Sequence, residues 1–184
     1  GIKKSRSNLR RLGYFDDVNI TTGPGSSENK MTVDVEVKER PTGFIAAGAG
    51  YSSADGMIVT AQITQKNLLG TGKQLDFSAL LSSKTQKYNL GFTEPWFLDK
   101  HISAGIDIFN TTREYTDFTK DSVGFGLRFG FPLYKRDTRG YLTYRLEEVE
   151  ISDVASNASQ IIKDQEGKNL TSSINAAIRR DTRD

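Results

Sequence analysis

From Gly43 onward the chain alternates apolar and polar residues with a period of two, and this pattern constrains the fold most. Successive side chains of a β-strand point to opposite faces, so strict alternation predicts strands with one apolar face. We find no helical period of useful length in this region. With Phe44–Tyr51 in front, the apolar faces predict eight strands. These faces comprise Met57, Val59, Ala61 and Ile63; Leu75, Phe77, Ala79 and Leu81; Tyr88, Leu90 and Phe92; Ile102, Ala104, Ile106 and Ile108; Val123, Phe125, Leu127, Phe129 and Phe131; Leu142, Tyr144 and Leu146; and Leu170, Ile174, Ala176 and Ile178.

The chemistry of the opposite faces separates two all-β folds. A soluble β-sandwich also alternates, but its solvent face carries many Lys and Glu, whereas these opposite faces carry Gly, Ser, Thr, Asn and isolated charges, as a wet barrel lumen does. Each strand is about the length, roughly 9 to 11 residues, that a tilted strand uses to cross a bilayer. The mean hydropathy of -0.50 agrees with a barrel, because only alternate residues face lipid. We therefore predict a mainly β fold, an antiparallel transmembrane β-barrel segment, with the soluble sandwich as the alternative.

Residues 1–41 follow a different pattern and are predicted to form a separate module. Lys3–Leu12 is rich in helix formers, and Gly13 would end a helix. Phe15–Thr22 and Met31–Lys38 read as two strands around a turn rich in Gly, Pro and Ser. Helix, strand, turn, strand is half of a small α+β module. The break at Pro41 sets the boundary, so the predicted domains are residues 1–41 and 42–184.

The connections between strands predict an orientation. Two links after odd-numbered strands, Asn110–Lys120 and Ile151–Lys168, are long and polar, whereas the links after even-numbered strands are all short. The latter are Asn67–Gly72, Glu94–Lys100 and Pro132–Asp137. Outer-membrane barrels have short periplasmic turns and longer outside loops, so the N-terminal module is expected on the periplasmic side.

Composition argues against an enzyme and against several binding functions. The 25 basic and 23 acidic residues nearly balance, so we expect no nucleic-acid partner. Without cysteine there is neither a disulfide scaffold nor a thiolate metal site, and His101, the single histidine, has no second histidine to share a metal. We expect no catalytic constellation, cofactor or metal. Gly48, Gly50, Gly124, Gly126 and Gly130 recur at period two within strands and open no helix, so they are not a nucleotide-binding loop.

Four motifs in order resemble the BamA-type assembly factors of the bacterial surface antigen superfamily. They are Val37-Lys38-Glu39-Arg40-Pro41-Thr42-Gly43, Gly48-Ala49-Gly50-Tyr51, Asn67-Leu68-Leu69-Gly70-Thr71-Gly72 and Gly91-Phe92-Thr93-Glu94-Pro95-Trp96-Phe97. Asn8–Val18 is similar to the second helix and following strand of a POTRA domain. The resemblance implies the end of the last POTRA domain followed by the first half of a barrel of roughly sixteen strands.

The resemblance also implies a function, a location and partners. The function is the assembly and insertion of β-barrel proteins into the bacterial outer membrane, with the N-terminal module in the periplasm. The partners are unfolded outer-membrane β-barrel proteins, accessory lipoproteins of the assembly complex and outer-membrane lipid. A passive pore or a two-partner secretion translocator with POTRA-barrel architecture is the alternative.

Two groups of residues are expected to act. The first strand offers an edge on which an incoming strand can pair when it is only weakly joined to the last strand of the barrel, and its small side chains would let those two strands separate at little cost. The resemblance makes the first strand one side of a lateral gate. An alternative is that small residues only relieve crowding. The proposed pairing edge is Phe44, Ile45, Ala46, Ala47, Gly48, Ala49, Gly50 and Tyr51. Trp96 and Phe97 are expected to anchor the barrel at the periplasmic membrane interface, with a ligand-binding aromatic pair as the alternative.

Overall fold

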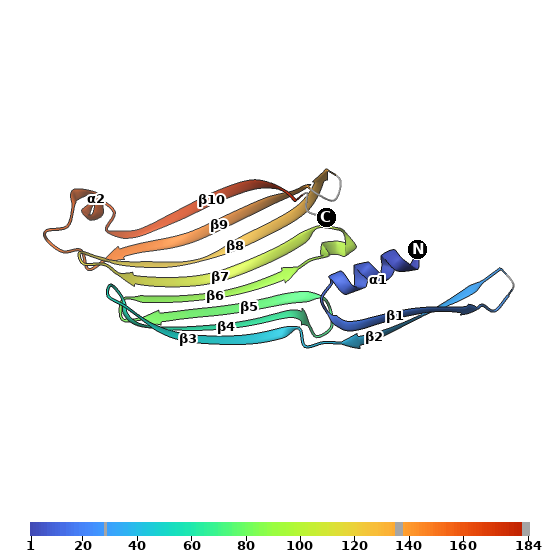
Figure 1. The fold of residues 1–184 in the computed structure, drawn as a ribbon. Helices are drawn as coiled ribbons and strands as arrows, with labels where there is room; N and C mark the ends of the chain where they lie inside the picture. Colours follow the sequence, from blue (N-terminus) through green and yellow to red (C-terminus); the bar gives the residue numbers. More distant parts are fainter. Residues whose placement is uncertain (28, 135–137, 182–184) are drawn as a thin grey trace. The chain divides into compact units, whose positions relative to one another are not determined.

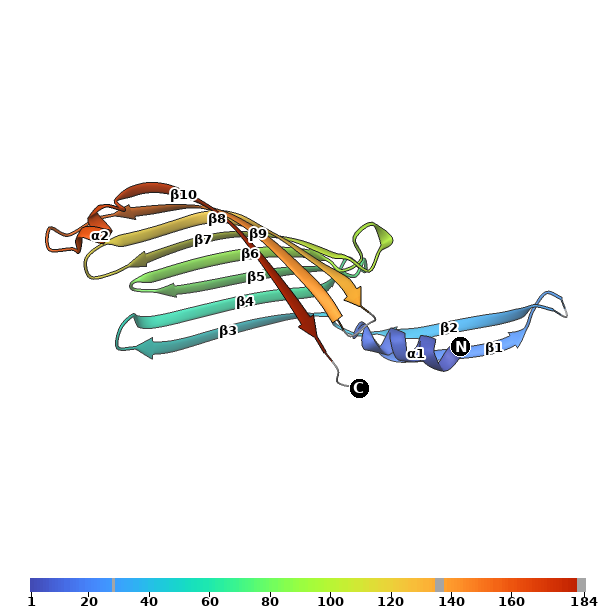
Figure 2. The ribbon, with the colours of Figure 1, turned by 90° about the horizontal axis from the view of Figure 1, so that it is seen from above.

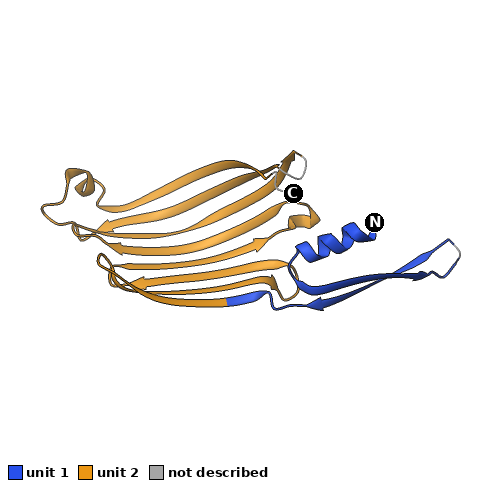
Figure 3. Ribbon diagram, viewed as in Figure 1, with its two compact units in different colours: residues 1–44 blue, residues 45–184 orange. Residues whose placement is uncertain are grey.

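The computed structural model describes residues 1–27, 29–134 and 138–181. The chain divides into two compact units, residues 1–44 and 45–184 (Figure 3). No helix of the described part is long and apolar enough to span a bilayer.

The first unit is a helix and a two-stranded sheet. Helix α1 (Ile2–Arg11) is followed by Gly13, whose φ of +71° is left-handed, and strands β1 (Phe15–Pro24) and β2 (Met31–Glu39) pair antiparallel. The helix packs on β1, where Val18 and Ile20 are buried. Arg6 Nη2 donates to the Ile20 carbonyl at 3.2 Å. The predicted helix and both predicted strands are therefore confirmed to within about two residues, the usual uncertainty of element ends.

The second unit is one antiparallel sheet of eight strands in sequence order, from β3 at one edge to β10 at the other (Figure 1). All eight predicted strands are confirmed. Their bounds are β3 (Gly43–Ser52), β4 (Gly56–Leu68), β5 (Lys73–Ser82), β6 (Thr85–Glu94), β7 (Ser103–Glu114), β8 (Thr119–Tyr134), β9 (Thr138–Ser152) and β10 (Gly167–Arg180). Seen from above, β9 and β10 run at a steep angle to β3, so the sheet is strongly coiled (Figure 2). This agrees with the fixed twist of paired strands.

The register places the predicted apolar residues on one face. Directly opposed residues of antiparallel strands share a face. From β4 to β9, one such row is Ile63, Phe77, Leu90, Ile108, Phe125 and Leu146, each paired with the next. A row of the other face contains Gln62, Ser78 and Asn89. Because the apolar face is broadly exposed, the sheet does not bury it as a sandwich would.

The predicted difference in link length is partly wrong. Strands β7 and β8 extend to Glu114 and from Thr119, so the predicted long link Asn110–Lys120 shrinks to residues 115–118. The ladder there pairs polar residues, and backbone hydrogen bonds need no apolar side chains. The β9–β10 link remains long, at residues 153–166, and contains the one-turn helix α2 (Gln160–Lys163). The predicted Pro132–Asp137 link lies partly outside the described residues, which end at Tyr134 and resume at Thr138.

Candidate functional site

The eight residues of the expected pairing edge all lie in β3, the edge strand of the sheet. Its only neighbour among the described strands is β4. The large side chains are Phe44 and Ile45 at one end and Tyr51 at the other, and all five residues between them are exposed Ala or Gly. An antiparallel strand with a single neighbour leaves alternate N–H and C=O groups unpaired.

A contact with β4 indicates which backbone groups of β3 point to the open edge. Thr60 Oγ1 donates to the Gly48 carbonyl at 3.5 Å, so this carbonyl faces β4. The N–H and C=O of one residue point the same way, and those of the next residue point the opposite way. The backbone groups of Ala47 and Ala49 therefore point to the open edge.

The middle of β3 packs little against the rest of the sheet. A shallow hollow of about 330 Å³ lies over the first three strands of the sheet, and Ala46, Ala47 and Gly48 line it on the β3 side. Fewer dispersion contacts hold such a strand than hold a bulky one. A strand paired with the middle of β3 would thus share fewer side-chain contacts with it than β7 and β8 share where Ile108 opposes Phe125.

Trp96 and Phe97 lie in the turn between β6 and β7, beside the 3₁₀ turn η1 (Phe97–Asp99). Both are part-exposed. The Trp96 ring lies against His101 in a tilted arrangement, with 4.4 Å between centroids, and the Phe97 N–H donates to the Ile102 carbonyl at 2.8 Å. His101 thus supports an aromatic turn. In the described part of the chain no three acidic, His or Cys side chains are grouped to hold a metal ion.

Sequence reasoning missed the ion-pair network on the polar face. Arg128 on β8 forms a bidentate pair with Asp107 on β7 through Nε and through Nη2, the latter at 3.0 Å. The same Nη2 donates to Thr93 on β6 at 3.1 Å, so one guanidinium joins three strands. A Cβ at Gly105 would lie 3.1 Å from that Nη2, so the glycine leaves room for it. The only signal in the sequence was the frequency of glycine on this face.

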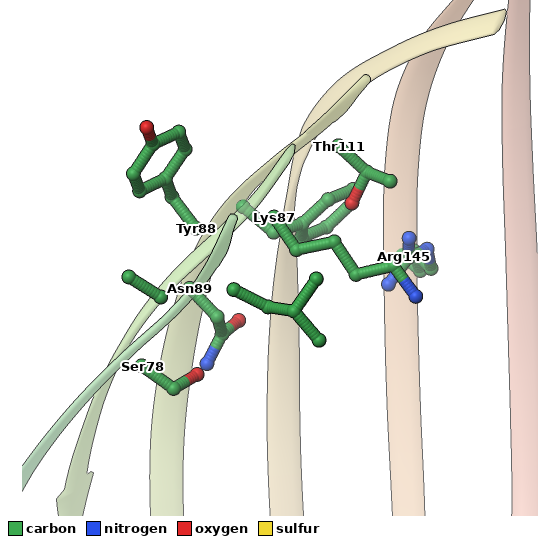
Figure 4. Close-up of a pocket in the computed structure, with 9 residues that line it drawn as sticks. Ser78, Lys87, Tyr88, Asn89, Thr111 and Arg145 are labelled. Carbon is green, nitrogen blue, oxygen red and sulfur yellow. The ribbon is translucent and has the colours of Figure 1, made fainter. Parts of the chain in front are cut away.

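A second cluster surrounds a hollow of about 350 Å³ on the same face (Figure 4). Arg145 extends over the Phe109 ring, with 3.6 Å from its guanidinium carbon to the centroid, and Nη2 pairs with Glu147 at 2.8 Å. The Lys87 side chain reaches toward Arg145, whereas Tyr88 points to the other side of the sheet (Figure 4). The hollow is open and has both polar and apolar lining residues, and among these residues no nucleophile has a base arranged beside it.

The comparisons with known proteins agree with this geometry. The family model described as the Omp85 superfamily domain matches residues 67–184. The outer membrane protein assembly factor BamA of Nitratidesulfovibrio vulgaris is 33% identical over 183 residues, which cover 100% of this chain and 23% of that protein. The mouse sorting and assembly machinery component 50 homolog is 25% identical over 190 residues, 98% of this chain and 39% of that protein.

A solved structure shares the fold. The crystal structure of BamA from Haemophilus ducreyi lacking POTRA domains 1–3 has a TM-score of 0.73 at 23% identity and covers 96% of this chain and 36% of that chain. This chain spans about a quarter or less of the assembly factors from N. vulgaris, Neisseria meningitidis and Neorickettsia risticii that it matches. The resemblance inferred from the four motifs is confirmed, and the chain belongs to the Omp85 superfamily.

Proposed function

We propose that this chain is part of a non-enzymatic factor that inserts β-barrel proteins into the bacterial outer membrane, and that β3 is the edge on which incoming strands pair. The observation that carries the proposal is the run of exposed Ala and Gly residues along the middle of β3, an edge strand of the described sheet. The other edge strand, β10, carries the large side chains Leu170, Ile174 and Ile178 instead. The names of the assembly-factor relatives support the same activity.

The physical basis is hydrogen bonding in an apolar phase. In lipid an unpaired backbone N–H or C=O costs several kcal/mol, so a client strand cannot enter alone. An edge strand supplies those bonds as the client strand arrives, through β-augmentation. The outward groups of Ala47 and Ala49 would make the first bonds. The chain's own chemistry is pairing, with no cofactor and no covalent step.

The partners and the location follow from this proposal. The clients are unfolded outer-membrane β-barrel proteins, the apolar face of the sheet meets outer-membrane lipid, and accessory lipoproteins complete the assembly complex. The first unit is a partial POTRA domain in the periplasm. Its helix on one face of a strand pair supports this assignment.

Locking the edge tests the proposal. One cysteine in β3 and one in the strand that meets β3 in the full-length barrel should, when oxidised, stop client assembly, and a reductant should restore it. Because this chain has no cysteine, an introduced cysteine has no native thiol of this chain with which it could form a disulfide. A matched control pair, Ser78→Cys with Asn89→Cys, joins directly opposed residues of β5 and β6.

The readout is the folded fraction of client barrels in the outer membrane. Oxidation of the control pair should leave that fraction unchanged, because β5 and β6 need not separate. Normal client assembly with the β3 lock closed would contradict strand pairing at this edge as the mechanism. The small residues of β3 would then only relieve crowding in the barrel wall. A passive translocator would instead lose export while client barrels still fold.

A further inference from the structure

Two turns at the same end of the sheet, β4–β5 and β6–β7, have the same unusual geometry. The β4–β5 turn is closed by hydrogen bonds from Gly70 N to Asn67 O (3.2 Å) and from Thr71 N to Leu68 O (3.1 Å). The β6–β7 turn repeats them. Asp99 N donates to Trp96 O (3.1 Å) and Lys100 N to Phe97 O (3.2 Å).

Each turn places a leucine in the left-handed backbone region. Leu69 has φ +51° and is followed by Gly70 at +74°, while Leu98 has φ +55° and is followed by Asp99 at +57°. Two consecutive positive φ values are typical of a type I′ turn, whose first position favours Asn, Asp or Gly. Leucine is strained there because its Cβ approaches the backbone. Strain of this kind persists where a site uses it.

Neither leucine is packed against the part of the chain that the structure describes. Leu69 is 91% exposed and Leu98 is 70% exposed, so both side chains project from the turn tips. Exposed Trp96 and the exposed pair Leu133 and Tyr134 at the end of β8 lie at this same end of the sheet. At the opposite end of the sheet the two shortest links, residues 53–55 and 83–84, are mostly polar, whereas the β7–β8 link carries the stacked rings of Tyr115 and Phe118.

Cations flank the two leucines, and in the second turn the exposed Asp99 also lies beside Leu98. Lys66 and Lys100 are exposed, and Lys73 pairs loosely with Glu94, with 3.7 Å between Nζ and Oε1. Long cationic side chains beside apolar tips suit the boundary between hydrocarbon and anionic headgroups, where the stems stay in the apolar region and the charges reach the phosphates.

We infer that Leu69 and Leu98 insert into a phospholipid leaflet that contains anionic lipid, and that the strained turns exist to project them. The inference rests on the membrane part of the proposed function. It adds two residues that set how deeply these turns lie in the bilayer. Trp96 marks the interface, and the two leucines reach past it into the acyl chains.

Site-directed spin labels test this in the full-length protein, reconstituted into vesicles of phosphatidylethanolamine with a minority of phosphatidylglycerol. Single cysteines replace Leu69, Leu98, Ile106 and Ser83 in a protein otherwise free of reactive cysteine, and each carries a nitroxide. Oxygen collects in hydrocarbon and a charged nickel chelate stays in water. We expect the oxygen-to-nickel accessibility ratio at positions 69 and 98 to be several-fold above that at position 83, and close to that at Ile106 on the apolar face.

Each other outcome overturns the inference in its own way. Ratios at 69 and 98 equal to that at 83 would place the tips in water. Low access to both reagents would mean a protein partner covers them. A water-like label at Ile106 would overturn the proposed membrane function together with this inference.

A variant with relaxed turns separates insertion from folding. Leu69→Asn with Leu98→Asn suits the left-handed conformation and removes both apolar tips. Its unfolding temperature in detergent micelles should equal or exceed that of the unmodified protein, whereas in the vesicles it should be lower. An unfolding temperature in vesicles that is not lowered would contradict insertion of the leucines.

Discussion

The guanidinium carbon of Arg145 lies 3.6 Å from the centroid of the Phe109 ring, although the two residues belong to β9 and β7 with β8 between them. Glycines on β8 make this possible. Gly124 is paired with Phe109 and Gly126 is paired with Arg145, so no β8 side chain separates the cation from the ring. A cation over an aromatic face contributes about 0.5–1 kcal/mol at an exposed site.

Gly124→Ala should therefore destabilise the sheet by about 1–3 kcal/mol, the cost of adding a methyl group to a filled site. The new Cβ would meet the Leu146 carbonyl oxygen, the Glu147 Cα at 2.8 Å and the Phe109 Cζ at 2.8 Å. Gly126→Ala is the control, because its nearest neighbour would be the Tyr144 carbonyl oxygen at 3.6 Å, an ordinary contact. The measurement is the urea midpoint of the full-length protein in vesicles. Equal midpoints for the two variants would contradict this packing.

Loss of the Asp107–Arg128 ion pair should lower the free energy of unfolding less than loss of a fully buried ion pair would. The Arg128 side chain is 42% exposed and that of Asp107 is 22% exposed, so water screens the charges. We expect Asp107→Asn to lower the free energy of unfolding by about 1 kcal/mol, and less at high salt. Lys73→Gln, at the loose 3.7 Å pair with Glu94, should cost about 0.5 kcal/mol or less. A loss at Asp107 no greater than that at Lys73 would show that the three-strand network adds nothing.

The two faces of the sheet should respond oppositely to a new charge. Ile106 lies in the middle of the apolar face, and Gln62 is exposed on the polar face. Ile106→Arg should cost about 2–4 kcal/mol if this face meets lipid, whereas Gln62→Arg should be near neutral. The folded fraction after refolding into vesicles at increasing urea measures both. A tolerated arginine at position 106 would contradict lipid contact at this face.

The face pattern was predictable because it depends on nearest neighbours only. Alternation places Phe77, Leu90 and Ile108 on one face of their own strands, and pairing in register then aligns them. Strand ends were less predictable. Thr119 to Ser122 carry mostly polar side chains, so no apolar period extends β8 to its observed start, although the backbone ladder continues there.

The site was predictable to a different extent in its two parts. The open edge at β3 follows from strand order, and Trp96 and Phe97 follow from their position in a turn. The contact of Arg145 with Phe109 requires the registers of β7, β8 and β9 together, which no local pattern contains. The positive φ of Leu69 and Leu98 was also hidden, because leucine is an unexpected residue at such positions.

Proline substitutions distinguish the two sides of β3. Proline removes one N–H donor, and neighbouring residues direct their N–H groups to opposite sides. The Ala47 N–H points to the open edge, since the Gly48 carbonyl faces β4. Ala47→Pro in the full-length protein should therefore reduce the folded fraction of client barrels while the factor itself inserts normally, and Ala47→Ser should change neither.

Ala46→Pro is the matched control, because the Ala46 N–H points to β4 as the groups of Gly48 do. It removes a bond of the β3–β4 ladder and should lower the stability of the factor itself, visible as a lower urea midpoint. Client folding is measured at equal amounts of inserted factor, so loss of the factor is not mistaken for loss of activity. The edge-pairing mechanism requires Ala47→Pro to impair clients more than Ala46→Pro per inserted molecule. If Ala46→Pro impaired clients more, the defect would come from lost stability of β3 within the sheet. The N–H groups on the open side of β3 would then have no role in assembly.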